Sequence, residues 1–192
     1  MVDTGPDIYA RMGVRAVINA QGNRTLLGGS ATVPEVTEVM LTVNNTYVAM
    51  RELLERSGEY IADMLGVEAA YVTSGASAAL ALSAAACMTG RDPDRIAQLP
   101  DTSGMKNEIV IQKAQRYAYD RSYTVPGAKL IEAGDEHGCS EKQLKHVIGP
   151  DTAAIAYFIT PDNTEAMLSL EQVVEVGRAV GLPTIADAAA QI

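Results

Sequence analysis

A short apolar run, a turn of small residues and an alanine-rich segment follow one another directly in residues 68–82. Residues 69–73 have the composition of a buried strand, and residues 77–88 are long enough and apolar enough for a helix. A strand that turns tightly into a helix through small residues exposes backbone N–H groups, hydroxyls and the positive end of the helix dipole. This arrangement predicts an anion site, most simply for a phosphate. The alternative is that Gly75 is only a turn residue and that the helix only packs closely on a sheet.

Segments typical of strands and of helices alternate through the rest of the chain. We expect strands at residues 108–112, 128–132, 153–158 and 184–187, and helices at 140–148 and 169–180. Strands that alternate with helices in this way form a mostly parallel sheet with helices on both faces. The sequence therefore predicts an α/β fold, and in such sheets ligands bind beyond the carboxyl ends of the strands.

The residues before this alternation have a different character. Val17 and Ile18 suit a short strand, but a glycine-rich loop follows them. Thr32 is expected to cap a helix in which Pro34 is early and Glu35 completes a capping box. A second helix is expected at residues 50–65. We therefore divide the chain into an N-terminal segment, residues 1–66, and an α/β domain, residues 67–192.

Composition limits the partners of the chain. Its 192 residues are 47% hydrophobic, which is enough for a sizeable core. The formal net charge is −9, and no cluster of Lys and Arg interrupts the acidic balance, so nucleic acid is not expected as a partner. There is no apolar run of membrane-spanning length and no signal-peptide pattern. Since Cys87 and Cys139 do not make a disulfide framework either, we expect a cytoplasmic protein with free thiols.

One carboxylate stands at a predicted strand end. Asp187 closes the otherwise apolar strand 184–187. An ionised carboxylate at that depth needs a cationic partner or a set of hydrogen bonds. It could cap a following helix. It could also pair with a protonated heterocycle whose phosphate lies on the turn before residue 77.

Several motifs together resemble a known enzyme family. The strand–turn–helix with the later aspartate looks like the large domain of pyridoxal-phosphate enzymes of the aspartate-aminotransferase fold. Further motifs resemble the branch related to bacterial selenocysteine synthase and D-glucosaminate-6-phosphate ammonia-lyase. These motifs are residues 17–22, 27–30, 69–75, 99–104 and 107–112. The resemblance spans nearly the whole chain.

The resemblance implies roles for individual residues. The cofactor phosphate would be held by Ser74, Gly75, Ala76 and Ser77. Asp187 would face the pyridine nitrogen and keep it protonated, so that the ring acts as an electron sink, and Gln191 would approach the phenolic oxygen. Gln115 falls where relatives usually place a histidine stacked over the ring, and an amide can cover a ring but lacks the proton chemistry of imidazole. Residues expected near the substrate are Asn19, Gln21, Arg24 and Arg116.

The resemblance also implies a residue that this sequence lacks. In the family the Schiff-base lysine follows the aspartate, whereas no lysine occurs here after Lys145. We therefore expect the chain to be the N-terminal portion of a longer enzyme, with a partial pyridoxal-phosphate-binding domain, and to be inactive alone. The N-terminal helices would help to form the interface of a homodimer or a larger assembly.

The leading hypothesis is a pyridoxal-phosphate-dependent lyase or transferase that acts on a small amino acid or amino sugar acid. The alternatives are a non-catalytic phosphate- or nucleotide-binding regulatory domain and an inactive dimerising relative. The dinucleotide and P-loop glycine patterns are both absent from the sequence, which weakens the nucleotide alternative. The segment 135–139, which contains Asp, Glu, His and Cys, has no second ligand pair, so we interpret it as a polar turn and expect no metal.

Overall fold

The structure, a computed structural model, describes residues 7–22, 25–160 and 163–189. Its contacts divide the chain into two compact units, residues 1–53 and 54–192. The division falls inside one helix, α3 (Met50–Leu65). The domain boundary that we predicted between residues 66 and 67 stays a prediction.

The first unit contains short helices joined by irregular chain. These are α1 (Asp7–Arg11), the 3-10 helix η1 (Thr25–Leu27) and α2 (Pro34–Val43). Helix α2 begins after Val33 and has no side-chain cap, so the predicted capping role of Thr32 is wrong. The Thr32 hydroxyl instead lies 3.0 Å from the hydroxyl of Thr37. Val17 and Ile18 do not form the suggested strand, because no described segment pairs with them.

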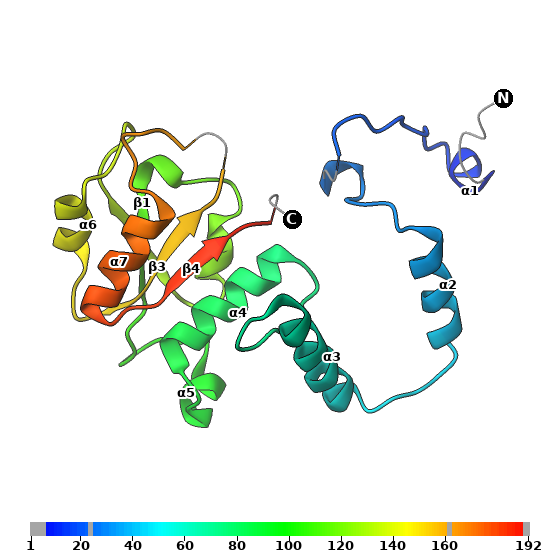
Figure 1. The fold of residues 1–192 in the computed structure, drawn as a ribbon, viewed down its shortest axis with the longest axis horizontal. Coiled ribbons are helices and arrows are strands. Elements are labelled where there is room, and N and C mark those ends of the chain that lie inside the picture. The colour runs from blue at the N-terminus through cyan, green and yellow to red at the C-terminus, as the bar shows by residue number, and fades with distance from the viewer. Residues whose placement is uncertain (1–6, 23–24, 161–162, 190–192) are drawn as a thin grey trace. The chain divides into compact units, whose positions relative to one another are not determined.

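The second unit is built on a four-stranded sheet with the order β2-β1-β3-β4, and all of its neighbouring strands are parallel (Figure 1). The strands are β1 (Glu108–Gln112), β2 (Lys129–Ala133), β3 (Thr152–Phe158) and β4 (Thr184–Asp187). The helices are α3, α4 (Ala76–Thr89), α5 (Pro93–Gln98), α6 (Glu141–Val147) and α7 (Leu170–Val180), and the short 3-10 helices are η2 (Lys113–Gln115) and η3 (Asp120–Thr124). The predicted α/β architecture is thereby confirmed.

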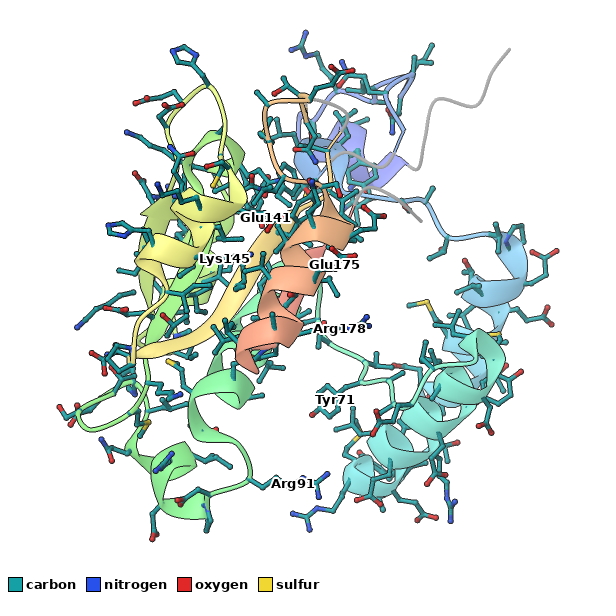
Figure 2. All side chains as sticks on the ribbon, turned by 60° about the vertical axis from the view of Figure 1, so that its left-hand side comes forward. Tyr71, Arg91, Glu141, Lys145, Glu175 and Arg178 are labelled. Atoms are coloured by element: carbon teal, nitrogen blue, oxygen red, sulfur yellow. The ribbon has the colours of Figure 1, made fainter. Side chains whose placement is uncertain are left out.

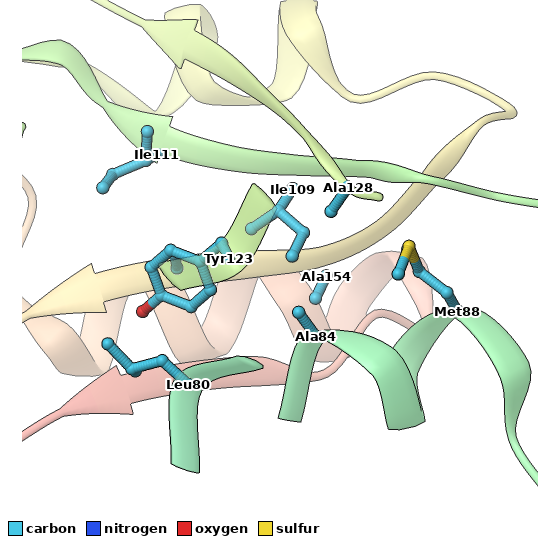
Figure 3. Packing of buried hydrophobic residues seen from close by; sticks show 10 residues of the cluster. Leu80, Ala84, Met88, Ile109, Ile111, Tyr123, Ala128 and Ala154 are labelled. Carbon is cyan, nitrogen blue, oxygen red and sulfur yellow. The ribbon is translucent and has the colours of Figure 1, made fainter. Parts of the chain in front are cut away.

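Two apolar clusters cover the two faces of the sheet. On one face α4 contributes Leu80, Ala84 and Met88 against β1 and β3, and Tyr123 of η3 completes the cluster (Figure 3). On the other face, Leu144 of α6 and two valines of α7 pack against Val110, Ile155 and Tyr157. Alternate residues of β1 and β3 therefore serve opposite faces, which is why both strands are apolar without interruption.

The helices α6 and α7 begin as the sequence predicts. Ser140 and Ser169 each form a capping box, with Gln143 and Gln172 respectively. The outer faces of both helices are charged: Glu141 and Lys145 of α6 form an ion pair at 2.7 Å, and Glu175 and Arg178 of α7 are exposed (Figure 2). Their inner faces remain free to pack on the sheet.

Residues 69–73 differ from the expectation. They belong to no strand, because no edge of the described sheet pairs with them. Tyr71, labelled in Figure 2, is consequently 65% exposed. Val72 is 44% exposed. The segment is held instead against α3, where Gly58 is buried beside the carbonyl group of Ala70.

This close approach leads to a stability prediction. A Cβ atom at position 58 would lie 2.4 Å from the Ala70 carbonyl oxygen, so one backbone segment would have to move. We expect Gly58→Ala to lower the free energy of unfolding by about 1–3 kcal/mol, although alanine favours a helix. The matched control is Gly149→Ala, where a Cβ atom would meet nothing within 4 Å. Urea denaturation that shows equal stability for the two variants would contradict the packing of residue 70 on α3.

Candidate functional site

The carboxyl ends of β1, β3 and β4 lie at one edge of the sheet. Phe158, the last residue of β3, and Asp187, the last residue of β4, are directly paired in the ladder. Helix α4 runs antiparallel to β4, so its N terminus points to the same edge (Figure 1). The turn predicted to bind an anion and the predicted carboxylate therefore share the edge at which ligands bind in parallel sheets.

The turn before α4 has the properties of an anion site. Ser74, Gly75, Ala76 and Ser77 are all exposed. Gly75 is the N-cap residue, and no side chain caps the helix, so the N–H groups of its first turn point outward without a side-chain acceptor. Gly75 has φ 142° and ψ 172°, a backbone conformation that residues with a Cβ atom rarely adopt. Glycine at this position is therefore required by the shape of the turn.

Asp187 is buried, with 6% of its surface exposed. Its Oδ2 atom accepts a hydrogen bond from the Tyr117 hydroxyl, and its Oδ1 atom accepts one from the Ala189 N–H at 3.1 Å. The interaction with Ala189 resembles the predicted capping role, but no described helix follows Asp187. Among the described residues, the donors to this carboxylate are thus two neutral groups, and no cation pairs with it.

Tyr117 and Phe158 form an aromatic pair next to this carboxylate. Their rings are stacked with centroids 4.0 Å apart and planes 1° apart. Burial, followed by the hydrogen bond to Asp187, raises the pKa of Tyr117 far above that of a free phenol. Burial and the charge of Asp187 also raise the pKa of Tyr123. Both phenols remain protonated at neutral pH, so Tyr117 acts as a donor.

Gln115 lies in a buried network of amide groups. Its Nε2 atom donates to the Phe158 carbonyl at 3.2 Å and to Asn163 Oδ1 at 3.1 Å, and its Oε1 atom accepts from Gln112 at 3.2 Å. Gln112 is in turn bound to both backbone groups of Leu168. The Gln115 amide thus makes hydrogen bonds that connect the end of β1 to the end of β3. It would have to break these hydrogen bonds in order to cover a cofactor ring.

Arg116 is also engaged within the protein. Its guanidinium group forms ion pairs with Asp120, which is buried, and with Glu132. Two carboxylates neutralise this single cation, so it could take a substrate anion only by leaving them. Binding of a substrate anion by Arg116 stays a prediction, and it would require Arg116 to break its ion pairs with Asp120 and Glu132.

The remaining predicted residues lie in the first unit or outside the described residues. Asn19 and Gln21 belong to the first unit, where the Asn19 side chain closes a local turn with Gln21 N–H and the Gly22 carbonyl. Arg24 and Gln191 lie outside the described residues. Among described residues no group of three or more His, Cys, Asp or Glu side chains could hold a metal ion, and none of the helices is long and apolar enough to cross a membrane.

Sequence reasoning missed Tyr117 and Phe158. Two signals could have found them. Phe158 is the sole phenylalanine and ends an apolar strand, and Tyr117 lies two residues after the position at which a ring-covering residue was expected. Their stacking depends on β1 and β3 being neighbours in the sheet, since Tyr117 follows β1 and Phe158 ends β3, and the sequence alone does not specify this order.

Comparison with solved structures defines the class of fold. The chain superposes on an aspartate aminotransferase from Thermotoga maritima with a TM-score of 0.54 at 15% identity, covering 95% of this chain and 48% of that chain. It superposes on PseC, an aminotransferase of pseudoaminic acid biosynthesis from Helicobacter pylori, with a TM-score of 0.52 at 20% identity, covering 81% and 39%. The fold is that of the aminotransferases, as the resemblance predicted.

Closer relatives place the chain within this fold class. It is homologous to D-glucosaminate-6-phosphate ammonia lyase of Salmonella typhimurium, with 36% identity over 191 residues, which are 97% of this chain and 52% of the relative. A solved structure of D-glucosaminate-6-phosphate ammonia-lyase matches with a TM-score of 0.91, again over 97% and 52% of the two chains. The 5'-C-glycyluridine monooxygenase-decarboxylase of a Streptomyces species is 31% identical over 192 residues, covering 95% and 48%. The chain thus spans about half the length of these curated relatives, and no protein-family model matches it.

The two buried phenols lead to a pH prediction. Because the folded protein raises their pKa values, it holds protons that an unfolded tyrosine loses above about pH 10. The free energy of unfolding should therefore be fully maintained below about pH 10 and fall as the pH rises further. Denaturant unfolding of the wild type should show this fall, and replacing both Tyr117 and Tyr123 by Phe should flatten it. Parallel losses in the wild type and the double variant would refute the assignment.

Proposed function

We propose that the protein to which this chain contributes is a pyridoxal-phosphate-dependent lyase or transferase, with an elimination or ammonia-loss reaction on a small amino acid or amino sugar acid. The observation that carries the proposal is the location of the buried Asp187 carboxylate and the uncapped N terminus of α4 at the same edge of the sheet. Homology to an ammonia lyase supports the reaction class.

The residues present fit this cofactor. Ser74 to Ser77 offer exposed N–H groups and two hydroxyls to a phosphate dianion, and a side chain at Gly75 would force the turn out of its shape. Asp187 offers a buried carboxylate to a protonated ring nitrogen, which is the charged donor that such an acceptor binds most strongly. A charged ring with a phosphate group matches both features.

The cofactor would supply an electron sink for a carbanion formed on the substrate. The described residues would orient the ring and its charge. Asp187 would hold the proton on the ring nitrogen, and the turn before α4 would fix the opposite end of the cofactor through its phosphate. The buried amides of Gln112 and Gln115 would keep the ends of β1 and β3 in register beneath the ring. Proton transfer at the substrate carbon requires a base. For this role we propose the Schiff-base lysine, which in the family follows the aspartate; this sequence has no lysine after Lys145.

The substrate class rests on the two curated relatives. One is named for a glucosaminate phosphate and the other for a glycyl-substituted uridine. Both names join an amino acid to a sugar, which supports an amino sugar acid as substrate here. The reactions for which the two relatives are named differ. We therefore propose the substrate class and leave the reaction subtype to groups outside the Asp187 carboxylate and the turn before α4. A homodimeric or larger assembly, with Asn19, Gln21 and Arg24 near the substrate, is part of the same proposal, and the expected cytoplasmic location stays a prediction.

Replacing the carboxylate tests the ring-nitrogen contact. Asp187→Asn keeps the shape of the side chain and an acceptor for Tyr117 but removes the charge that keeps the nitrogen protonated. In the full-length enzyme we expect turnover to fall by about 100-fold or more, with weaker binding of pyridoxal phosphate. Steady-state kinetics and equilibrium dialysis measure the two effects. Turnover close to that of the wild type would remove Asp187 from the site.

Replacing the turn glycine tests the phosphate contact. Gly75→Val forces a Cβ atom into a backbone conformation with φ 142°, so the N–H groups should turn away from the phosphate and the visible absorbance of bound pyridoxal phosphate should be lost. Gly104→Val is the control, because Gly104 also has a positive φ, of 76°, but precedes β1 at the opposite edge of the sheet. A normal cofactor spectrum in Gly75→Val would contradict the assignment. So would an equal loss of the visible absorbance in Gly75→Val and Gly104→Val, provided that both variants fold.

A further inference from the structure

Tyr117 donates its hydroxyl to the buried Asp187 carboxylate. It is half-buried, in the segment between η2 and η3, and its ring lies flat on Phe158 with a centroid separation of 4.0 Å. Phe158 and Asp187 are neighbours in the β3–β4 ladder. The phenol therefore rests on the end of one strand while its hydroxyl reaches the carboxylate at the end of the next.

The acceptor capacity of Asp187 shows what this contact does. In the described part of the chain, the carboxylate receives a hydroxyl donor at Oδ2 and a single backbone N–H at Oδ1. A buried carboxylate that lost its hydroxyl donor would bear a large desolvation cost. The hydroxyl of Tyr117 thus makes the site stable in the absence of any ligand. An incoming donor gains correspondingly less from Asp187, because it replaces a hydrogen bond that is already made.

We propose that Tyr117 is an internal competitor for the cofactor: its hydroxyl occupies the place at Asp187 Oδ2 that a protonated ring nitrogen would take, and it must leave when the ring binds. This inference rests on the proposed function. A charged N–H donor forms a stronger bond to a carboxylate than a neutral hydroxyl does, so the exchange favours the cofactor. The same exchange lowers the apparent affinity, because the closed contact has to be broken first.

The stacking on Phe158 is what makes the competition effective. A tyrosine on an exposed loop would lose side-chain entropy whenever its hydroxyl met the carboxylate. The stacked Phe158 ring already restricts the rotation of the Tyr117 side chain, so less entropy is lost when the hydroxyl meets Asp187. Aromatic pairs also add stabilisation beyond their buried area. Tyr119 lacks both advantages: it is 54% exposed and touches Tyr117 only edge-on, with centroids 6.4 Å apart. It therefore provides a matched control.

The test measures ligand binding without covalent chemistry. Pyridoxamine 5'-phosphate has the ring nitrogen and the phosphate but cannot form a Schiff base, so its affinity reports these contacts alone. In the full-length protein freed of cofactor, Tyr117→Phe should bind it about tenfold more tightly than the wild type, and the empty variant should unfold at a lower temperature. Tyr119→Phe should change neither quantity.

A second variant covers the case in which Tyr117→Phe does not fold. Phe158→Leu keeps the Tyr117 side chain but removes the ring on which it stacks. The hydrogen bond from Tyr117 to Asp187 should therefore weaken. The affinity for pyridoxamine 5'-phosphate should rise, by a smaller factor than in Tyr117→Phe. Equal or weaker binding in the folded variants would overturn the inference, since it would mean that Tyr117 supports the carboxylate for the ligand. Failure of the wild type and of every variant to bind would instead overturn the proposed function, and the inference with it.

Discussion

The parallel ladder between β1 and β3 is the interaction on which the rest of the second unit depends. Its register places Ile109 beside Ala154 and Ile111 beside Ala156, so each strand sends alternate side chains to both apolar clusters. The same register brings Gln112 and Phe158 to one edge of the sheet, where the buried amides of Gln112 and Gln115 join the two strand ends. A slip by one residue would exchange the two faces and break this network.

Much of the second unit could be predicted from local sequence. Ser140 and Ser169 with their glutamines mark helix starts through hydrogen bonds that depend only on residues three positions apart. The strands at 108–112 and 184–187 were predicted with their observed bounds. Strand β1 is buried on both faces, so its apolar run is short and clear. Strand β4 is marked instead by Gly181 and Pro183, which separate it from the preceding helix. The position of Asp187 at a strand end followed from the same reasoning.

What could not be predicted depends on contacts between distant segments. Residues 69–73 have the composition of a strand, yet strand formation requires a partner as well as suitable side chains, and the described sheet offers them none. Thr32 has the right spacing for a capping box, but α2 starts at Pro34 with Val33 as the flanking residue. The contact between Tyr117 and Asp187 joins residues from two parts of the sequence through a sheet order that no local pattern encodes.

The crossover between β1 and β3 has a consequence for the order of assembly. Strand β1 is at the centre of the described sheet, but its partner β3 comes after β2 and α6 in the chain. During synthesis, Ile109, Val110 and Ile111 are therefore made well before the strand that covers them on one side. Non-local pairing of this kind closes slowly, and an unpaired apolar strand is prone to pair with another chain. Strand β2 precedes β3 in the chain and pairs with β1 on its other side, so early formation of the β1–β2 pair would leave only one side of β1 open until β3 is made.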